Sequence, residues 1–355
     1  MQAFVYEALP VRVVFGWGRI EEVAAEAERL GMRRALVLST AGRGAALAED
    51  VAARLGGVCA GVHPGAVMHT PVSATEAALE VVRERRVDGL VAVGGGSTTG
   101  LAKALALRTD LPQLVLPTTY AGSEMTPILG ETEGGKKTTR RDLRVLPETV
   151  IYDPALTLGL PLSVTATSGL NAIAHAVEAL YAENRNPVID LLAEEGIRRL
   201  ARALIELRAA PEDRTARTVA LYGAWLCGIC LGSVGMALHH KLCHVLGGMF
   251  DLPHAETHAV ILPHVVAFNA EACPEAMAAV GRALGAADAA KGLEQLARSL
   301  GIGRALRDLG MPEDGIERVV EAVLEQPPWN PRKLTGDGLR AMLARAWHGA
   351  PLGTG

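Results

Sequence analysis

The chain has 355 residues, of which 49% are hydrophobic and 21% are charged, and its formal net charge is −4 at pH 7. This composition is typical of globular proteins and excludes a mainly disordered or fibrous chain. The slight acidity and the aromatic content of 4% also argue against a nucleic-acid-binding protein, which is normally basic. The length predicts about two domains.

The cysteines and the N-terminus indicate the compartment. Five cysteines in a chain of this size are too few, and odd in number, for a disulfide framework. The first residues, MQAFVYEALPVRVVFGWG, lack the basic patch followed by an apolar run that marks a secretory signal. We therefore expect a protein of the reducing cytoplasm.

The first half of the chain alternates short apolar runs with amphipathic segments. The apolar runs predict buried strands at 34–40, 87–93 and 113–117. The amphipathic segments predict helices at 45–55, 74–86 and 101–107. This alternation predicts a parallel sheet covered by helices.

The pattern changes after residues 153–161. Strand-like runs nearly vanish, and long Ala/Leu/Glu/Arg segments follow at helical period at 167–183, 187–208, 213–234 and 236–248, with several more up to 347. We therefore predict two domains, an α/β domain over 1–158 and an all-helical domain over 159–355.

One segment of the helical half, 219–238, carries no charge and is long enough to span a bilayer. Four glycines interrupt it and a histidine-rich helix follows at once, so we predict a buried helix and no membrane span. The Cys227-x-x-Cys230 spacing inside this run lacks the exposed setting of a redox motif. These two cysteines are predicted to be buried structural thiols.

Glycines and hydroxyl side chains follow the predicted strands. Gly94, Gly95 and Gly96 lie between a strand and a helix, where a helix N-terminus offers free N–H groups to a pyrophosphate. The segment is neither a GxGxxG fingerprint nor a triphosphatase loop, and a tight turn is the alternative interpretation. Hydroxyl residues at this strand end and the next favour a dinucleotide site: Ser97, Thr98, Thr118 and Thr119. Ser39 and Thr40 stand at an earlier strand end, where an acid often marks a preference for NAD, so these neutral residues leave the choice between NAD and NADP open.

Six of the ten histidines fall between residues 239 and 264. His240 and His244 share one helix face, and Asn171 and His175 share another. Histidine is the commonest metal ligand and the usual proton-transfer group near neutral pH. His175, His240 and His254 could supply nitrogens to a metal, but Asn171 brings an amide where a metal would want a carboxylate. The spacing therefore indicates a metal site, but the amide of Asn171 predicts a low affinity for a metal ion.

These residues resemble the iron-containing (group III) alcohol dehydrogenase family over essentially the whole chain. The resemblance rests on GGGS at 94–97, PTT at 117–119 and the spacing of His240, His244 and His254. Five longer runs match one branch of the family more closely: GGGSTTGLAK (94–103), PTTYAGSEMTPILGETE (117–133), KTTRRDLRVLPETVIYDP (137–154), SGLNAIAHAVEALYA (168–182) and MALHHKLCHVLGGMFDLPHAETH (236–258).

The resemblance implies a dehydroquinate synthase-like fold, with a dinucleotide-binding α/β domain, an all-α domain and a site in the cleft between them. It implies cofactor contacts from Gly94, Gly95, Gly96, Ser97, Thr118, Thr119 and Lys137. The family's metal ligands, one Asp and three His, map to Asn171, His175, His240 and His254. Asn171 removes the only anionic ligand, and Gly100 stands where metal-dependent relatives commonly have Asp. We therefore expect no required metal.

The matching branch implies a reductase that uses NADH or NADPH to saturate the C=C bond of a small dicarboxylate, a 4-oxo-2-enedioate. His244, which is not a mapped metal ligand, is the first choice for the general acid, and His240, His254 and His175 are the other catalytic candidates. The candidates for holding the substrate are Asn171, Lys241, Tyr120 and His258.

The expected partners are therefore a small dicarboxylate and, by resemblance, a second copy in a homodimer, with no nucleic acid and no membrane. Two alternatives stay open: a metal-dependent alcohol or aldehyde dehydrogenase of the same fold, and a non-catalytic dinucleotide- or metal-binding regulator. The residues leave open NADH against NADPH, and a plain against a chlorinated substrate.

Overall fold

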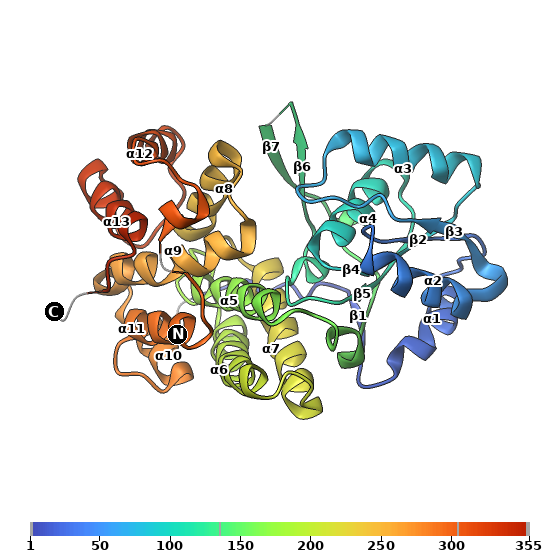
Figure 1. Ribbon diagram of the computed structural model, residues 1–355, viewed down its shortest axis with the longest axis horizontal. Coiled ribbons are helices and arrows are strands. Elements are labelled where there is room, and N and C mark those ends of the chain that lie inside the picture. The colour runs from blue at the N-terminus through green and yellow to red at the C-terminus, as the bar shows by residue number, and fades with distance from the viewer. Residues whose placement is uncertain (1–2, 135, 304, 353–355) are drawn as a thin grey trace. The chain divides into compact units, whose positions relative to one another are not determined.

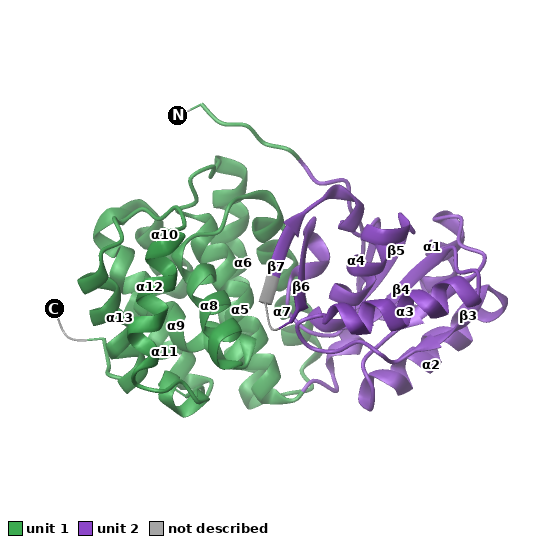
Figure 2. Cartoon of the chain, turned by 90° about the horizontal axis from the view of Figure 1, so that it is seen from above, with its two compact units in different colours: residues 1–7, 161–355 green, residues 8–160 purple. Residues whose placement is uncertain are grey.

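The computed structural model describes residues 3–134, 136–303 and 305–352 and divides into two compact units (Figure 2). Unit 2 comprises residues 8–160. Unit 1 comprises residues 161–355 together with residues 1–7. The N-terminal segment thus groups with the helical half of the chain, an association that the sequence pattern does not reveal.

Unit 2 is built on a six-stranded parallel sheet in the order β1-β8-β5-β4-β2-β3 (Figure 1). Its strands are β1 (Arg12–Phe15), β2 (Ala35–Leu38), β3 (Cys59–His63), β4 (Gly89–Gly94), β5 (Gln113–Pro117) and β8 (Thr149–Tyr152). The strand order reverses between β2 and β4, because the chain adds β3 on one side of β2 and then returns to the other side.

Helices cover both faces of this sheet, which is why its central strands are continuous apolar runs. They are α1 (Val23–Arg29), α2 (Arg43–Leu55), α3 (Val72–Glu84) and α4 (Gly96–Thr109). Helix α1 packs against α2, and α3 packs against α4. One core cluster joins Val23 and Val51 of the first pair to Val37, Val91 and Leu114 of the sheet.

A two-stranded antiparallel hairpin, β6 (Ile128–Glu133) and β7 (Lys136–Arg141), stands apart from the main sheet. Its strands read ILGETE and KKTTRR, with no continuous apolar run. The hairpin was not predicted from the sequence, because a strand pair this polar gives no periodic hydrophobic signal.

Unit 1 is helical, and its described residues contain no strand. The helices are α5 (Leu162–Ala179), α6 (Pro187–Ala209), α7 (Arg214–Ser233), α8 (Leu238–Phe250), α9 (His254–Asn269), α10 (Pro274–Leu284), α11 (Ala289–Ser299), α12 (Gly315–Glu325) and α13 (Gly336–His348). The predicted change from an alternating to an all-helical pattern is thus confirmed.

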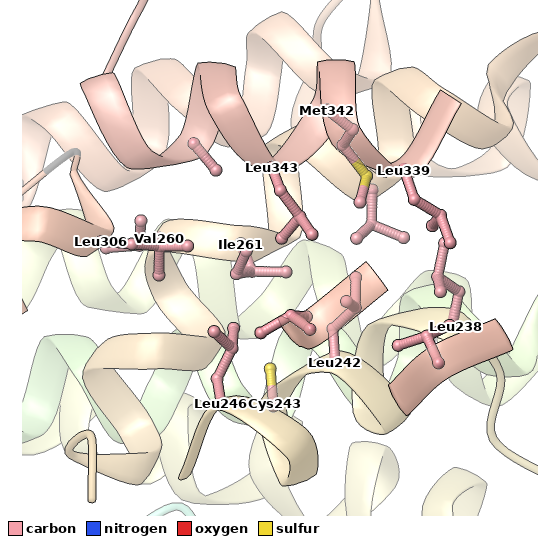
Figure 3. Packing of buried hydrophobic residues seen from close by; sticks show 14 of the residues in the cluster. Leu238, Leu242, Cys243, Leu246, Val260, Ile261, Leu306, Leu339, Met342 and Leu343 are labelled. Atoms are coloured by element: carbon pink, nitrogen blue, oxygen red, sulfur yellow. The ribbon is translucent and has the colours of Figure 1, made fainter. Parts of the chain in front are cut away.

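Helices α8, α9, α12 and α13 share an apolar core (Figure 3). Leu242 and Leu246 of α8 pack there with Ile261 of α9, Val323 of α12 and Leu343 of α13. This core fixes the relative positions of α8 and α9, which carry most of the clustered histidines.

The apolar run 219–238 does not form one helix, because α7 ends at Ser233 and α8 begins at Leu238. Within the described residues, no single helix combines the length and hydropathy of a membrane span. Only α7 and α8 taken together, which meet at 93°, pass such a test. Cys227 and Cys230 are fully buried, and burial raises the pKa of both thiols, which confirms the prediction of structural thiols.

Candidate active site

Three of the predicted cofactor loops lie at the carboxyl ends of neighbouring strands in unit 2. Ser39 follows β2, Gly94 ends β4, and Thr118 follows β5. Because β2, β4 and β5 are adjacent and parallel, these loops meet at one edge of the sheet, with Gly94 paired to Pro117. This edge includes the point between β2 and β4 where the strand order reverses, which is where open α/β sheets bind ligands.

The glycine loop is shaped by close contacts that leave no room for a side chain at two positions. A Cβ on Gly94 would collide with Thr98 Oγ1, and one on Gly95 would lie 2.9 Å from Thr119 Cγ2. A Cβ on Gly96 would meet only Ala121, at 3.7 Å. Helix α4 begins at Gly96, earlier than the predicted 101, so the N–H groups of Gly96 and Ser97 lie in a first turn that offers them no helical carbonyl.

The hydroxyls at this edge include two without a hydrogen-bond partner among the described residues. Ser39 Oγ and Thr98 Oγ1 are both buried and unpaired. Thr40, Thr118 and Thr119 are half-buried beside them. The free amides, the glycine cradle and the unpaired hydroxyls fit a dinucleotide pyrophosphate. Lys137 lies in β7, but its side chain is outside the described residues.

Lys103 ties α4 to the segment that follows the second loop. Its Nζ donates to Ser123 O and Thr126 O, both at 2.6 Å, and to Thr126 Oγ1 and Ile128 O, both at 2.9 Å. Burial lowers the pKa of Lys103 to about 7, opposed by the negative charge of Glu124. Tyr120, a predicted substrate contact, is fully buried at the start of this segment.

Unit 1 gathers the predicted catalytic residues, and every predicted substrate contact except Tyr120, around α5, α8 and α9. Asn171 and His175 lie on α5, His240 and His244 on α8, and His254 begins α9. The rings of His175 and His240 have centroids 4.9 Å apart, and those of His244 and His254 are stacked at 6.3 Å. The structure therefore brings together histidines separated by up to 79 positions in the sequence.

A hydrogen-bonded chain runs through the buried part of this cluster. His240 Nδ1 lies 2.6 Å from Glu178 Oε2, and His175 Nδ1 lies 2.8 Å from His240 Nε2. Asn171 Nδ2 lies 3.4 Å from His175 Nε2. A neutral His240 that donates from Nδ1 to Glu178 must accept at Nε2 from His175. Glu178 therefore sets the tautomer of both rings, and Asn171 donates at the end of the chain.

Glu178 is the functional residue that the sequence reasoning missed. It is fully buried on α5 and also accepts from the backbone N–H of Ala237 at 2.9 Å and of His239 at 2.7 Å. The carboxylate thus caps the start of α8 as well as orienting His240. The available signal was its spacing, because positions 171, 175 and 178 share one face of a helix.

A second buried group lies deeper, where His239 Nε2 is 3.0 Å from His258 Nδ1 and 3.8 Å from Cys243 Sγ. Burial lowers the pKa of both imidazoles well below its usual value, and neighbouring histidines lower it further. His258, a predicted substrate contact, is therefore a fully buried neutral ring whose centroid lies 4.4 Å from that of His254.

His244 and His254 are the half-buried members of the predicted catalytic set, while His175 and His240 are buried. Lys241, also half-buried, lies three residues before His244 on α8 and makes no ion pair with the described residues. Partial exposure makes His244, His254 and Lys241 the polar groups of the cluster that a solute can reach.

The family's metal set fits these residues poorly. Asn171 contributes a neutral amide in place of a carboxylate. The donor atoms of His175, His240 and His254 do not converge as a metal site requires. Among the described His, Cys, Asp and Glu side chains, no group of three whose donor atoms lie within 4.8 Å of one another includes any of these histidines. A Cβ on Gly100 would collide with Thr70 Oγ1, so an Asp at position 100 would also need Thr70 to move.

Comparisons with known proteins cover both units. Residues 10–154 match the family model of iron-containing alcohol dehydrogenase, and residues 165–347 match its C-terminal model. The chain is 53% identical to a maleylacetate reductase of Rhizobium sp. strain MTP-10005, over 99% of both chains. It is 55% identical to one of Burkholderia cepacia, over 98% of this chain and 99% of that one.

A solved structure shows the same likeness. The crystal structure of maleylacetate reductase from Agrobacterium tumefaciens matches with a TM-score of 0.95 and 54% identity, covering 99% of each chain. Together with the six-stranded parallel sheet and the helical unit, these matches establish that the chain belongs to the iron-containing alcohol dehydrogenase family.

Proposed function

We propose that this protein is a maleylacetate reductase, which reduces the C=C bond of maleylacetate to give 3-oxoadipate with NADH or NADPH, in the degradation of aromatic compounds. The observation that carries the proposal is an identity of 53–55% to maleylacetate reductases over 98% or more of the chain. The histidine cluster supports it, because the cluster offers hydrogen-bond donors and places the neutral amide of Asn171 where the family has an anionic metal ligand.

Maleylacetate is a 4-oxo-2-enedioate, so its reduction needs a hydride on the alkene carbon β to the ketone and a proton on the adjacent carbon. The reduced nicotinamide supplies the hydride. Negative charge then develops on the ketone oxygen as an enolate, and a donor placed at that oxygen lowers the barrier. In this proposal the His254 imidazole donates to the oxygen, in the role that a metal ion has in the metal-dependent relatives.

His244 is the proposed general acid, because it is half-buried, stacks on His254 and lies outside the set that maps to the family's metal ligands. Glu178 orients His240, and His240 orients His175. These buried rings support the more exposed His244, which lies next to His240. Lys241 is proposed to bind one substrate carboxylate, since its ammonium has no ion-pair partner among the described residues.

The proposal includes activity without a bound metal and assembly as a homodimer. The test follows NADH and NADPH absorbance with freshly generated maleylacetate, using enzyme treated or not with a strong chelator. Rapid oxidation that is indifferent to chelation supports the proposal. Activity that returns only with added iron or zinc, or turnover of simple alcohols in place of maleylacetate, would point to a metal-dependent dehydrogenase. Sedimentation of the same preparation tests the dimer.

A further inference from the structure

A cysteine and two histidines converge in the core of unit 1 and have no part in the proposed reaction. His239 and Cys243 lie one turn apart on α8, and His258 faces them from α9. Their exposed fractions are 0%, 1% and 0%. Cys243 lies beside Leu246 in the apolar core (Figure 3). Burying an imidazole in such a core costs free energy unless its nitrogens are hydrogen-bonded or bind a metal.

The three donor atoms have the separations of a transition-metal site. Zinc bonds of ~2.05 Å to nitrogen and ~2.3 Å to sulfur place tetrahedral ligands ~3.3 Å apart for two nitrogens and ~3.6 Å apart for nitrogen and sulfur. Here His239 Nε2 lies 3.0 Å from His258 Nδ1 and 3.8 Å from Cys243 Sγ. All three donor atoms lie within 4.8 Å of one another. The two pairs that include His239 need to shift by only a few tenths of an ångström to reach these separations. The distance from His258 Nδ1 to Cys243 Sγ needs a somewhat larger shift.

The hydrogen bonds of the cluster do not account for all its polar atoms. The outer nitrogens, His239 Nδ1 and His258 Nε2, are buried without a hydrogen-bond partner among the described residues. The proton shared by the two inner nitrogens can therefore move to an outer nitrogen, which frees both inner lone pairs. No backbone movement is needed for the imidazoles to act as ligands.

We propose that His239, Cys243 and His258 bind a soft or borderline divalent metal ion, with zinc as the best fit. Two imidazoles and a thiolate suit zinc and exclude magnesium and calcium, which take oxygen ligands. On binding, the thiol proton of Cys243 leaves to solvent and a Zn–S bond forms.

This site shares no ligand with the family's mapped set, but it lies against the proposed catalytic histidines. The ring of His258 has its centroid 4.4 Å from that of His254 and 5.0 Å from that of His240. A bound metal would fix the His258 ring and so change the packing of the His254 ring, the proposed donor to the ketone oxygen. Zinc at this site is therefore an inhibitor of turnover, a consequence that rests on the proposed function, whereas binding itself does not.

The test titrates chelator-stripped, full-length protein with Co²⁺ and Zn²⁺. One bound equivalent, with a thiolate-to-cobalt charge-transfer band that zinc abolishes, is the expected result, and its absence in the unmodified protein would overturn the proposal. Cys243→Ala and His258→Gln are each expected to weaken binding about 100-fold or more, since even supporting residues of a metal site cost 10–100-fold. Zinc should inhibit the unmodified enzyme and spare Cys243→Ala.

Two controls separate this site from other metal binding. Cys273→Ala removes a half-buried thiol outside the group and should leave the charge-transfer band intact. His175→Gln removes a mapped ligand of the family set and should also leave the band intact. Cobalt that binds without a charge-transfer band, and whose binding is lost in His175→Gln but not in Cys243→Ala, would assign the metal to the family set and refute the proposed site. Circular dichroism of each variant confirms folding.

Discussion

At the scale of single residues, Glu178 determines how the buried histidines can share protons. Its carboxylate meets His240 Nδ1 and two backbone N–H groups at the start of α8. The chain from Glu178 through His240 to His175 ends at Asn171, whose Oδ1 is buried and unpaired among the described residues. In the proposed reaction Glu178 is thus a positioning residue, because its carboxylate meets the substrate only through the rings it orients.

Replacing Glu178 with Gln tests this role. The amide keeps only one acceptor oxygen for the three donors that Glu178 now accepts from, so the His240 ring is held less firmly and kcat is expected to fall about 100-fold, the usual size of an acid–base contribution. The KM for NADH should not change, and the pH profile of kcat should shift. Steady-state kinetics measure all three. Glu183→Gln, an exposed position just beyond α5, is the matched control, and an unchanged kcat in Glu178→Gln would refute the positioning role.

A substitution at Asn171 tests whether the missing carboxylate is what prevents metal binding at the family's ligand set. Asn171→Asp restores the carboxylate of the family's ligand set beside His175, so we expect it to bind one more equivalent of zinc or iron than the unmodified chain. Metal-free turnover should fall about tenfold, or ~1.4 kcal/mol, because the end of the hydrogen-bonded chain loses its amide donor. Elemental analysis after dialysis measures the metal. Asn171→Leu, which offers no ligand, is the control, and equal metal in both variants would contradict the expectation.

The sequence predicts the members of the site better than their roles. Helical spacing brings Asn171 and His175 together, and the density of histidines marks α8 and α9. No pattern shows that Glu178 meets His240, because the two are 62 positions apart and lie on different helices. Likewise, nothing in the sequence separates the half-buried His244 and His254 from the fully buried His239 and His258, since that depends on how α8 packs on α9.

At the scale of elements, three central strands were predictable, whereas the two edge strands and the buried strand β8 were not. The central strands β2, β4 and β5 are apolar throughout, because helices cover both of their faces. Strand β3 reads CAGVH and lies at the sheet edge, half-buried along its length. Strand β1 lies at the other edge and strand β8 is buried between β1 and β5, and each has only four residues. Such segments are set by pairing with distant strands, which a local pattern does not record.

The glycine loop gives a prediction at this scale. Gly96→Ala would add a methyl at the open mouth of the loop, so we expect it to raise the KM for the dinucleotide about tenfold, with an unchanged Tm. Gly94→Ala would collide with Thr98 inside the loop and should also lower stability by about 1–3 kcal/mol. Gly159→Ala, with nothing within 4 Å of the added Cβ, is the control. A Gly96→Ala enzyme with the parental KM would place the pyrophosphate elsewhere.

At the scale of the whole molecule, the buried histidines give unit 1 its response to acid. Burial lowers the pKa of His239 and His258 well below the usual value, and burial together with Arg345 lowers that of His264 to about 4. Between pH 6.5 and 4 the unfolded chain therefore binds protons at these positions that the folded chain does not. The free energy of unfolding is highest above pH 6.5 and falls as the pH drops through this window.

For His264, the shift from 6.5 to about 4 predicts a loss of about 2 kcal/mol of stability between pH 8 and pH 5. Gln does not bind a proton in this range. The loss of stability between pH 8 and pH 5 should therefore be about 2 kcal/mol smaller in His264→Gln than in the parent. Urea unfolding at the two pH values measures both proteins. Trp17 lies in unit 2, whereas Trp225, Trp329 and Trp347 lie in unit 1, so a Trp17→Phe background reports unit 1 alone by fluorescence. Parallel pH dependence in His264→Gln and its parent would show that His264 is protonated in the folded chain, and that the acid response arises from His239 and His258.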